Sequence, residues 1–264
     1  MGLIVVASAK GSPGVTTTSL AVGALWERPA IVAECDPSGG DIAWRIPAPD
    51  GQVLDSHTGL LSLVAAGRKS LHPGLVRQHT QTIVGGLEVL VGVGAPEQAG
   101  GLTQQWAQFG PLFAAVPGYD VIADLGRIGS VTPQNNLLGS ASAIVLVVNV
   151  APSSIVHLRE RLGFVNTSVG GPMGAPIHVV VVAPPKRTQA VREIRDALAR
   201  TEIPLAGIHH VAHDPRGANV FQGQIKGNPD RTALVRSVLP IAHDLSETTA
   251  GFFLVPDHET MVSR

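Results

Sequence analysis

The 264-residue sequence has a single cysteine, Cys35, so no disulfide can form within the chain, and the composition fits a reducing compartment. One thiolate per chain also disfavours an iron–sulfur cluster, which takes several. The formal net charge is only −1, so no global field favours nucleic acid or an anionic membrane. No hydrophobic run approaches the roughly 20 residues that a membrane helix needs. The start, MGLIVVASAKGS, has no basic segment followed by a long apolar core, as a signal peptide would. We therefore expect a soluble, cytoplasmic protein.

What the sequence does have is apolar β-type segments, within a chain that is 44% hydrophobic. Runs such as VLVVN and VVVVA are apolar without alternation, as expected of parallel strands that are covered on both faces. Helix-like stretches such as 187–200 lie between many of these runs, and that alternation predicts a parallel sheet flanked by helices. We predict an α/β fold with a parallel sheet of about seven strands, helices on both faces, and one domain over residues 1–264. The predicted strands are 3–7, 30–34, 88–93, 120–124, 143–149, 177–183 and 206–212.

The segment AKGSPGVTTTSLA, residues 9–21, joins a strand-like run to a helix-like run. Gly11 and Gly14 allow the tight backbone of a P-loop, whose amides and following helix N-terminus hold phosphates. Thr16 is placed to bind Mg²⁺, and Thr17 to contact a phosphate. The lysine expected before Thr16 is missing and Val15 stands in its place, so an ordinary turn that starts a helix is the alternative. A dinucleotide-binding loop is disfavoured, because no G-x-G-x-x-G is present.

Two acidic motifs follow other predicted strands. ECDPSGGD brings Glu34, Asp36 and Asp41 to the carboxyl end of a strand, where open α/β sheets build their sites. YDVIADLGRIG places Asp124 at a similar position, where an acid can hold the hydration shell of Mg²⁺ as a Walker B aspartate does. For Asp41 a solvated loop acid is an equal alternative, whereas the shared setting of Asp36 and Asp124 favours a metal and nucleotide site.

Together these motifs resemble the ParA/MinD family of deviant Walker A P-loop ATPases, and the resemblance runs nearly end to end. The first lysine of that family's loop is kept as Lys10. ECDPSGGD resembles the family's switch I, and YDVIADLG resembles its switch II. VLVVNVAPSSIVHLRERL and LAGIHHVAHDPRGANVFQG resemble its later strand–helix segments. The missing loop lysine, together with TGLLSLVAAG and LEVLVGVGAPEQ, is most similar to the CpaE/TadZ pilus-assembly branch.

The resemblance implies a homodimer that encloses two molecules of ATP, or ADP, with Mg²⁺. Lys10 would reach across to the partner's phosphates and act in catalysis with Asp36, which would orient water. Thr16, Asp36 and Asp124 would form the metal site. The nucleotide-binding set would be Lys10, Gly11, Ser12, Pro13, Gly14, Val15, Thr16, Thr17, and, near the base, Ala212, His213 and Asp214. Ser12, Pro13 and Val15 depart from the family's loop pattern.

The sequence therefore predicts an ATP-binding switch for intracellular positioning or assembly, such as partitioning or pilus-type localisation, with a protein partner. Because Val15 replaces the loop lysine, we expect at most slow Mg-dependent ATP hydrolysis. The alternative is a nucleotide-free pseudo-ATPase scaffold or regulatory interaction protein. A DNA-binding partition ATPase is a weaker alternative, given the near-neutral charge. The C-terminal stretch AGFFLVPDHETMVSR has an apolar patch but no basic amphipathic helix, so a MinD-type membrane anchor is not evident.

Three histidines, His209, His210 and His213, suggest a metal cluster at first sight. Adjacent residues of a strand point to opposite faces, so His209 and His210 cannot easily share an ion. We therefore interpret these histidines as packing or surface residues. In the same way we interpret Cys35 as a buried apolar side chain.

Overall fold

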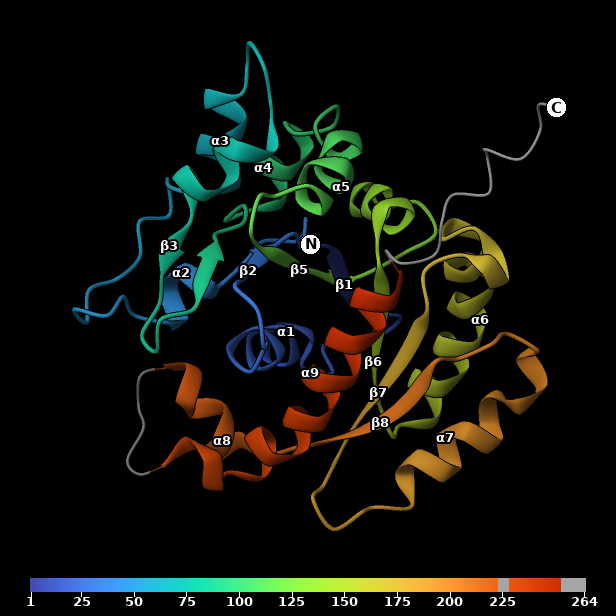
Figure 1. Ribbon diagram of the computed structural model, residues 1–264. Coiled ribbons are helices and arrows are strands. Elements are labelled where there is room, and N and C mark those ends of the chain that lie inside the picture. Colours follow the sequence, from blue (N-terminus) through green and yellow to red (C-terminus); the bar gives the residue numbers. More distant parts are fainter. Residues whose placement is uncertain (223–227, 253–264) are drawn as a thin grey trace, which may run out of the picture.

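The computed structural model describes residues 1–222 and 228–252, and its centre is one eight-stranded sheet (Figure 1). The strand order is β3-β4-β2-β5-β1-β6-β7-β8, and every neighbouring pair is parallel except β3–β4. The strands are β1 (Leu3–Ser8), β2 (Ala30–Glu34), β3 (Gln81–Thr82), β4 (Glu88–Leu90), β5 (Asp120–Arg127), β6 (Ala143–Asn149), β7 (Ile177–Ala183) and β8 (Gly207–Ala212). The predicted parallel α/β sheet is therefore confirmed.

The sheet differs from the prediction mainly at one edge, and the central strand β5 also extends to Arg127, three residues beyond the predicted 120–124. The prediction missed the two-residue antiparallel strand β3, and it extended β4 to residue 93, whereas β4 ends at Leu90. The cause lies in the hydrogen bonds of the next residues. The Val91 carbonyl accepts from Leu60 N–H at 2.8 Å, and the Val93 carbonyl accepts from Gly40 N–H at 2.7 Å. These carbonyls accept hydrogen bonds from neighbouring segments and not from an adjacent strand of the sheet. The local sequence does not contain this information.

Helices cover both faces of the sheet, as predicted, because the strand side chains alternate between two apolar clusters. In β1, Leu3 and Val5 belong to one cluster, and Ile4 and Val6 to the other. The Leu3 cluster is completed by residues of α3 (Leu60–Ala66), α4 (Pro96–Gly100), α5 (Trp106–Ala114), α6 (Pro152–Ser168) and α7 (Ala190–Leu198). The Ile4 cluster is completed by residues of α1 (Val15–Ala24), α2 (Ile42–Arg45), and α9 (Ala233–Phe252). Figure 1 shows α1 and α9 together on one face.

The topology opens a crevice beside the centre of the sheet. β1 and β6 are neighbours, but the helices that follow them pack on opposite faces: α1 with the Ile4 cluster and α6 with the Leu3 cluster. The loops after the two strands therefore diverge at the carboxyl edge. This is the switch point at which open α/β sheets bind their ligands. The loop predicted to bind phosphate leaves β1 at this point.

Among the helices within the described ranges, none combines the length and the apolar character that a bilayer crossing requires. Most of the C-terminal segment in which we looked for a membrane anchor, residues 253–264, lies outside the described residues.

Candidate nucleotide-binding site

The loop between β1 and α1 has the backbone that its glycines predict. Gly11 and Gly14 adopt left-handed conformations, with φ of 68° and 96°, which a residue with a side chain rarely accepts. Gly14 is the N-cap of α1 and gives the helix no side-chain cap. The first N–H groups of a helix lack intrahelical partners, and the helix dipole makes them a site for an anion. The loop therefore presents uncapped amides at the edge of the sheet.

These amides border a polar cavity of about 550 Å³ at the carboxyl ends of β1, β2 and β5. Thr16, Asp36 and Asp124, the three predicted metal-site residues, all line it. Its other lining residues are Gly11, Ser12, Gly14, Val15, Thr17, Glu34, Ser38, Gly39, Gly40, Asp41, Arg45, Gly126 and Arg127. The three separate sequence motifs thus meet in one cavity. A pair of carboxylates and a hydroxyl form a donor set that suits Mg²⁺.

Asp124 is the most perturbed acid of this cavity, with only 1% of its surface exposed. Burial raises the pKa of its carboxyl to about 7, and hydrogen bonds from Thr16 and from Gly126 N–H oppose that rise. The Gly126 bond is 2.9 Å long. An acid whose negative charge is poorly compensated by the protein favours a bound cation, which restores the compensation. The electrostatics of Asp124 therefore suit a metal site.

The Asp36 side chain lies against β5 at Gly126, two residues after Asp124, and this contact brings the two acids together. A Cβ atom built on Gly126, whose φ is +59°, would collide with the Asp36 carboxylate. The other oxygen of the same carboxylate, Oδ1, accepts a hydrogen bond from Ser38 N–H at 2.8 Å. Glycine at position 126 is thus required both by the backbone angle and by the neighbouring acid.

Glu34, in the same motif as Asp36 and Asp41, holds the backbone of the surrounding loops. Its Oε1 accepts from Asp41 and Ile42 N–H at 2.8 and 3.0 Å, and its Oε2 accepts from Gly92 N–H at 3.0 Å. Burial raises the pKa of Glu34, and these three backbone bonds oppose the rise. The side chain therefore ties the Asp36 loop to the chain beyond β4. Asp41, for which a solvated acid was the alternative, is exposed and pairs with Arg45 at 3.2 Å.

A second cavity, of about 400 Å³, adjoins the polar one across the loop, and Ser12, Gly14 and Thr17 line both. Its further residues are Pro13, Thr18, Asn149, Val182, Ala183, Pro184, Val211, Ala212, His213, Asp214, Pro215, Ala218 and Leu234. All three residues predicted to lie near the base, 212–214, are among them. Their lining neighbours are mostly apolar, as a nucleobase pocket requires. The Asp214 side chain is itself occupied, since it accepts from Gly217 and Ala233 N–H at 3.0 and 2.9 Å.

Two predicted residues stand apart from this arrangement. Lys10 is exposed and lines neither cavity of its own chain. Val15 borders the polar cavity but is only 6% exposed and belongs to the apolar cluster beneath α1. The predicted roles of both residues remain predictions.

Sequence reasoning missed several residues that line the cavities, among them the polar residues Arg45, Arg127 and Asn149. Arg45 and Arg127 are the two cationic side chains around the polar cavity. Arg45 follows ECDPSGGD by four residues, and Arg127 lies within YDVIADLGRIG, three residues after Asp124. Only this closeness to the acidic residues gave a signal. Asn149 ends β6, and its Oδ1 accepts from Ala151 N–H at 3.0 Å.

Comparison with known proteins gives no match to a family model and no match to a curated protein by sequence. The structure, however, is similar to solved structures. A ParA family ATPase from Chlorobium tepidum TLS superposes with a TM-score of 0.66 at 16% identity, over 96% of this chain and 98% of that one. The septum site-determining protein MinD of Pyrococcus horikoshii OT3, complexed with Mg-ADP, gives 0.66 at 12% identity, over 96% and 99%. A chain of the MinC:MinD cell division protein complex of Aquifex aeolicus gives 0.60 at 19% identity, over 94% of this chain and 96% of that one. At these identities the likeness establishes the fold, which is the P-loop NTPase fold of ParA and MinD.

Proposed function

We propose that this chain is a single ATP-binding domain that acts as a ParA/MinD-like nucleotide switch. One observation carries the proposal: the loop separates a polar cavity that holds Thr16, Asp36 and Asp124 from an apolar cavity at the end of β8. A nucleotide spans these two environments, with phosphates and Mg²⁺ in the first and the base in the second. The Mg-ADP bound to the P. horikoshii MinD supports the same ligand class.

Hydrolysis is slow or absent in this proposal. The transferring phosphoryl group needs compensation of its charge, and Val15 supplies none. Arg45 and Arg127 line the polar cavity, but Arg45 is paired with Asp41. The protein therefore works through its bound state, as a homodimer that recruits a protein partner in positioning or assembly. The replacement of the loop lysine supports a place in the CpaE/TadZ-like pilus-assembly branch, and the MinC:MinD complex is a precedent for a protein partner.

Titration calorimetry with ATP, with and without Mg²⁺, tests the proposal. We expect Mg-dependent binding of ATP or ADP, weaker than that of a protein with the loop lysine. Thr16→Val should remove the dependence on Mg²⁺, because it deletes the hydroxyl and keeps the shape of the side chain. Thr103→Val, a matched change outside both cavities, should leave it unchanged. A folded protein that gives no heat at millimolar ATP would overturn the proposal.

The second candidate is a scaffold that binds no nucleotide. The burial of Val15 in the apolar cluster favours it, since the position of the phosphate-binding cation serves packing. The same titration decides between the two, because the scaffold predicts no heat with either nucleotide.

A further inference from the structure

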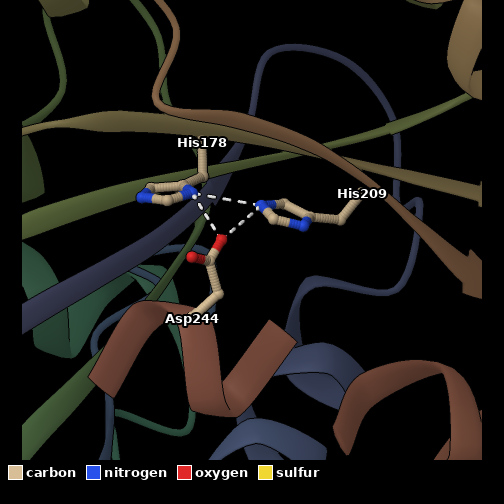
Figure 2. A group of neighbouring side chains, drawn as sticks. All are labelled: His178, His209 and Asp244. Carbon is tan, nitrogen blue, oxygen red and sulfur yellow. Dashed lines mark hydrogen bonds and ion pairs between the residues drawn. The ribbon is translucent and has the colours of Figure 1, made fainter. Parts of the chain in front are cut away.

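Three side chains from three separate elements converge away from the nucleotide cavities (Figure 2). His178 is the second residue of β7, His209 is the third residue of β8, and Asp244 lies on α9. They are 1%, 18% and 47% exposed, so the group runs from the interior to the surface. Within the part of the chain that the structure describes, this is the one cluster of three such groups with ligand atoms close enough to share an ion.

The separations of the three atoms match a metal site. His178 Nδ1 is 3.1 Å from His209 Nε2, and Asp244 Oδ2 lies 3.9 Å from the first and 3.5 Å from the second. These three separations place the point equidistant from the atoms at about 2.0 Å from each, which is the length of a zinc–nitrogen or zinc–carboxylate bond. In a tetrahedral zinc site, adjacent ligand atoms are about 3.3 Å apart. The spacing of the three atoms is therefore close to that of a zinc site, and the 3.9 Å separation must shorten by a few tenths of an ångström for a tetrahedral ion.

Hydrogen bonding alone explains this arrangement poorly. One bond can join the two rings, but the Asp244 oxygen is too far from either nitrogen for a good hydrogen bond, which needs about 3.2 Å or less. The other ring nitrogen of His178, Nε2, is buried with no partner. When Nδ1 binds a metal, Nε2 carries the proton of the neutral ring, so this orphaned nitrogen does not by itself favour the metal-bound form.

Burial acts on both imidazole rings of this cluster. Burial, with a smaller effect of His209, lowers the pKa of His178 to about 4. Burial also lowers the pKa of His209, and Asp244 opposes this. Two imidazoles and one carboxylate are a borderline donor set that suits zinc better than Mg²⁺ or Ca²⁺.

We propose that His178, His209 and Asp244 bind a divalent transition-metal ion of the zinc class, which joins the C-terminal helix α9 to β7 and β8. Three protein ligands leave one coordination position, and the exposed side of Asp244 opens it to water. The ion clamps α9 against the sheet edge, and His209 lies three residues before Ala212, which lines the base cavity. None of the three ligands lines either cavity, so the proposal does not rest on ATP binding.

Metal analysis and titration test the site. The purified full-length chain is stripped with a chelator, and Zn²⁺ is titrated in competition with a chromophoric chelator. We expect one tight site per chain, and Co²⁺ in the same site should show the visible absorption of tetrahedral cobalt. His209→Ala deletes one of three ligands, so it should weaken Zn²⁺ binding by more than the roughly 10- to 100-fold that loss of a group supporting a ligand costs. Zn²⁺ should also slow hydrogen exchange in α9, because binding to the folded state alone stabilises it.

Two further variants keep the test sharp. Asp244→Asn changes a half-exposed side chain, so it removes a ligand charge with little risk to folding, and it should weaken Zn²⁺ binding as well. The matched control is His243→Gln, which deletes an exposed imidazole one residue away and should leave the tight site intact. The proposal is overturned if the wild-type chain has no tight site. It is also overturned if both ligand variants, shown by circular dichroism to be folded, bind Zn²⁺ as the wild type does.

Discussion

Asp36 packs against the bare Cα of Gly126, so that even a methyl group at position 126 would collide with the Asp36 carboxylate. The same glycine donates its N–H to Asp124 Oδ1 at 2.9 Å. One residue therefore sets the positions of both acids that we assign to the metal site. The relationship between the two acids depends on the absence of a side chain between them.

Gly126→Ala should cost more free energy in Mg-ATP binding than in the stability of the folded chain. The left-handed backbone costs alanine about 1–2 kcal/mol of stability, and the collision displaces Asp36 in addition. The matched control is Gly51→Ala, where φ is +82° but a Cβ would meet open space. Urea unfolding and calorimetry on both variants separate strain from collision. Equal ATP affinity in the two variants would contradict the proposed role of Asp36.

Val15→Lys should increase ATP affinity by about 10- to 150-fold, the effect of one charged hydrogen bond of roughly 1.5–3 kcal/mol. Because Val15 is 6% exposed, the new side chain must extend into the polar cavity that Val15 borders. Phosphate release should then rise measurably. Val15→Met adds similar length without charge and should change neither quantity. A gain with methionine would show that packing, and not charge, limits the site.

Arg127→Gln should weaken ATP binding by about 10-fold or more if this cation faces the phosphates. Arg127 lines the polar cavity, whereas the other cation there, Arg45, is paired with Asp41. Arg127→Lys should restore part of the affinity, because it restores the charge without the planar fork. Arg195→Gln, on α7, is the control and should have no effect. Calorimetry in low salt measures the ATP affinity of all three variants. An unchanged affinity in Arg127→Gln would show that Arg127 does not contact the phosphates.

Asp124→Asn should stabilise the nucleotide-free protein, and the gain should grow with pH. The pKa of Asp124 is about 7 in the folded state against 3.8 ordinarily, so the folded chain binds this proton more tightly than the unfolded chain. Its contribution to stability is complete below about pH 4 and is lost as pH rises through about 7. Three pKa units correspond to about 4 kcal/mol, as an upper value at pH 8. Urea unfolding of both proteins from pH 5 to 8 measures this, and a difference independent of pH would contradict it.

Lys10→Ala should abolish ATP-promoted dimerisation and leave the monomer folded. Lys10 is exposed and lines neither cavity of its own chain, which leaves its charge available to a partner's phosphates. Light scattering with and without ATP measures the change. Lys186→Ala, an exposed lysine near α7, is the control. An ATP-dependent dimer that persists in Lys10→Ala would show that Lys10 points elsewhere.

Patterns that are local in the sequence predicted much of the fold. Apolar runs located seven strands of the sheet, and Gly11 and Gly14 indicated a tight loop that the backbone confirms. Open α/β sheets bind ligands at the carboxyl ends of their strands, and this rule predicted that Asp36 and Asp124 lie near each other. Both acids line the polar cavity. These features depend on few residues and short spacings, so a single sequence contains them.

Long-range contacts could not be predicted in this way. His178 and His209 are 31 residues apart and meet only because β7 and β8 pair in one particular register. His209 and His210 are adjacent on β8 and point to opposite faces, so they do not form a pair, and the imidazole beside His209 is that of His178 on β7. Likewise, the Glu34 carboxylate accepts hydrogen bonds from the backbone N–H groups of residues 41, 42 and 92, which are distant from it in the sequence or lie across a loop. Only the folded chain brings such groups together.

The packing of α9 against α1 has a consequence for synthesis on the ribosome. Val22, near the start of the chain, shares an apolar cluster with Leu234, Val238 and Leu245, which are translated more than 200 residues later. Until α9 emerges, the part of this apolar cluster that α9 covers stays exposed to the surroundings of the nascent chain. A chain that is released early therefore presents an adhesive apolar surface. A chaperone that shields this surface would be needed longest over the β1 and α1 region.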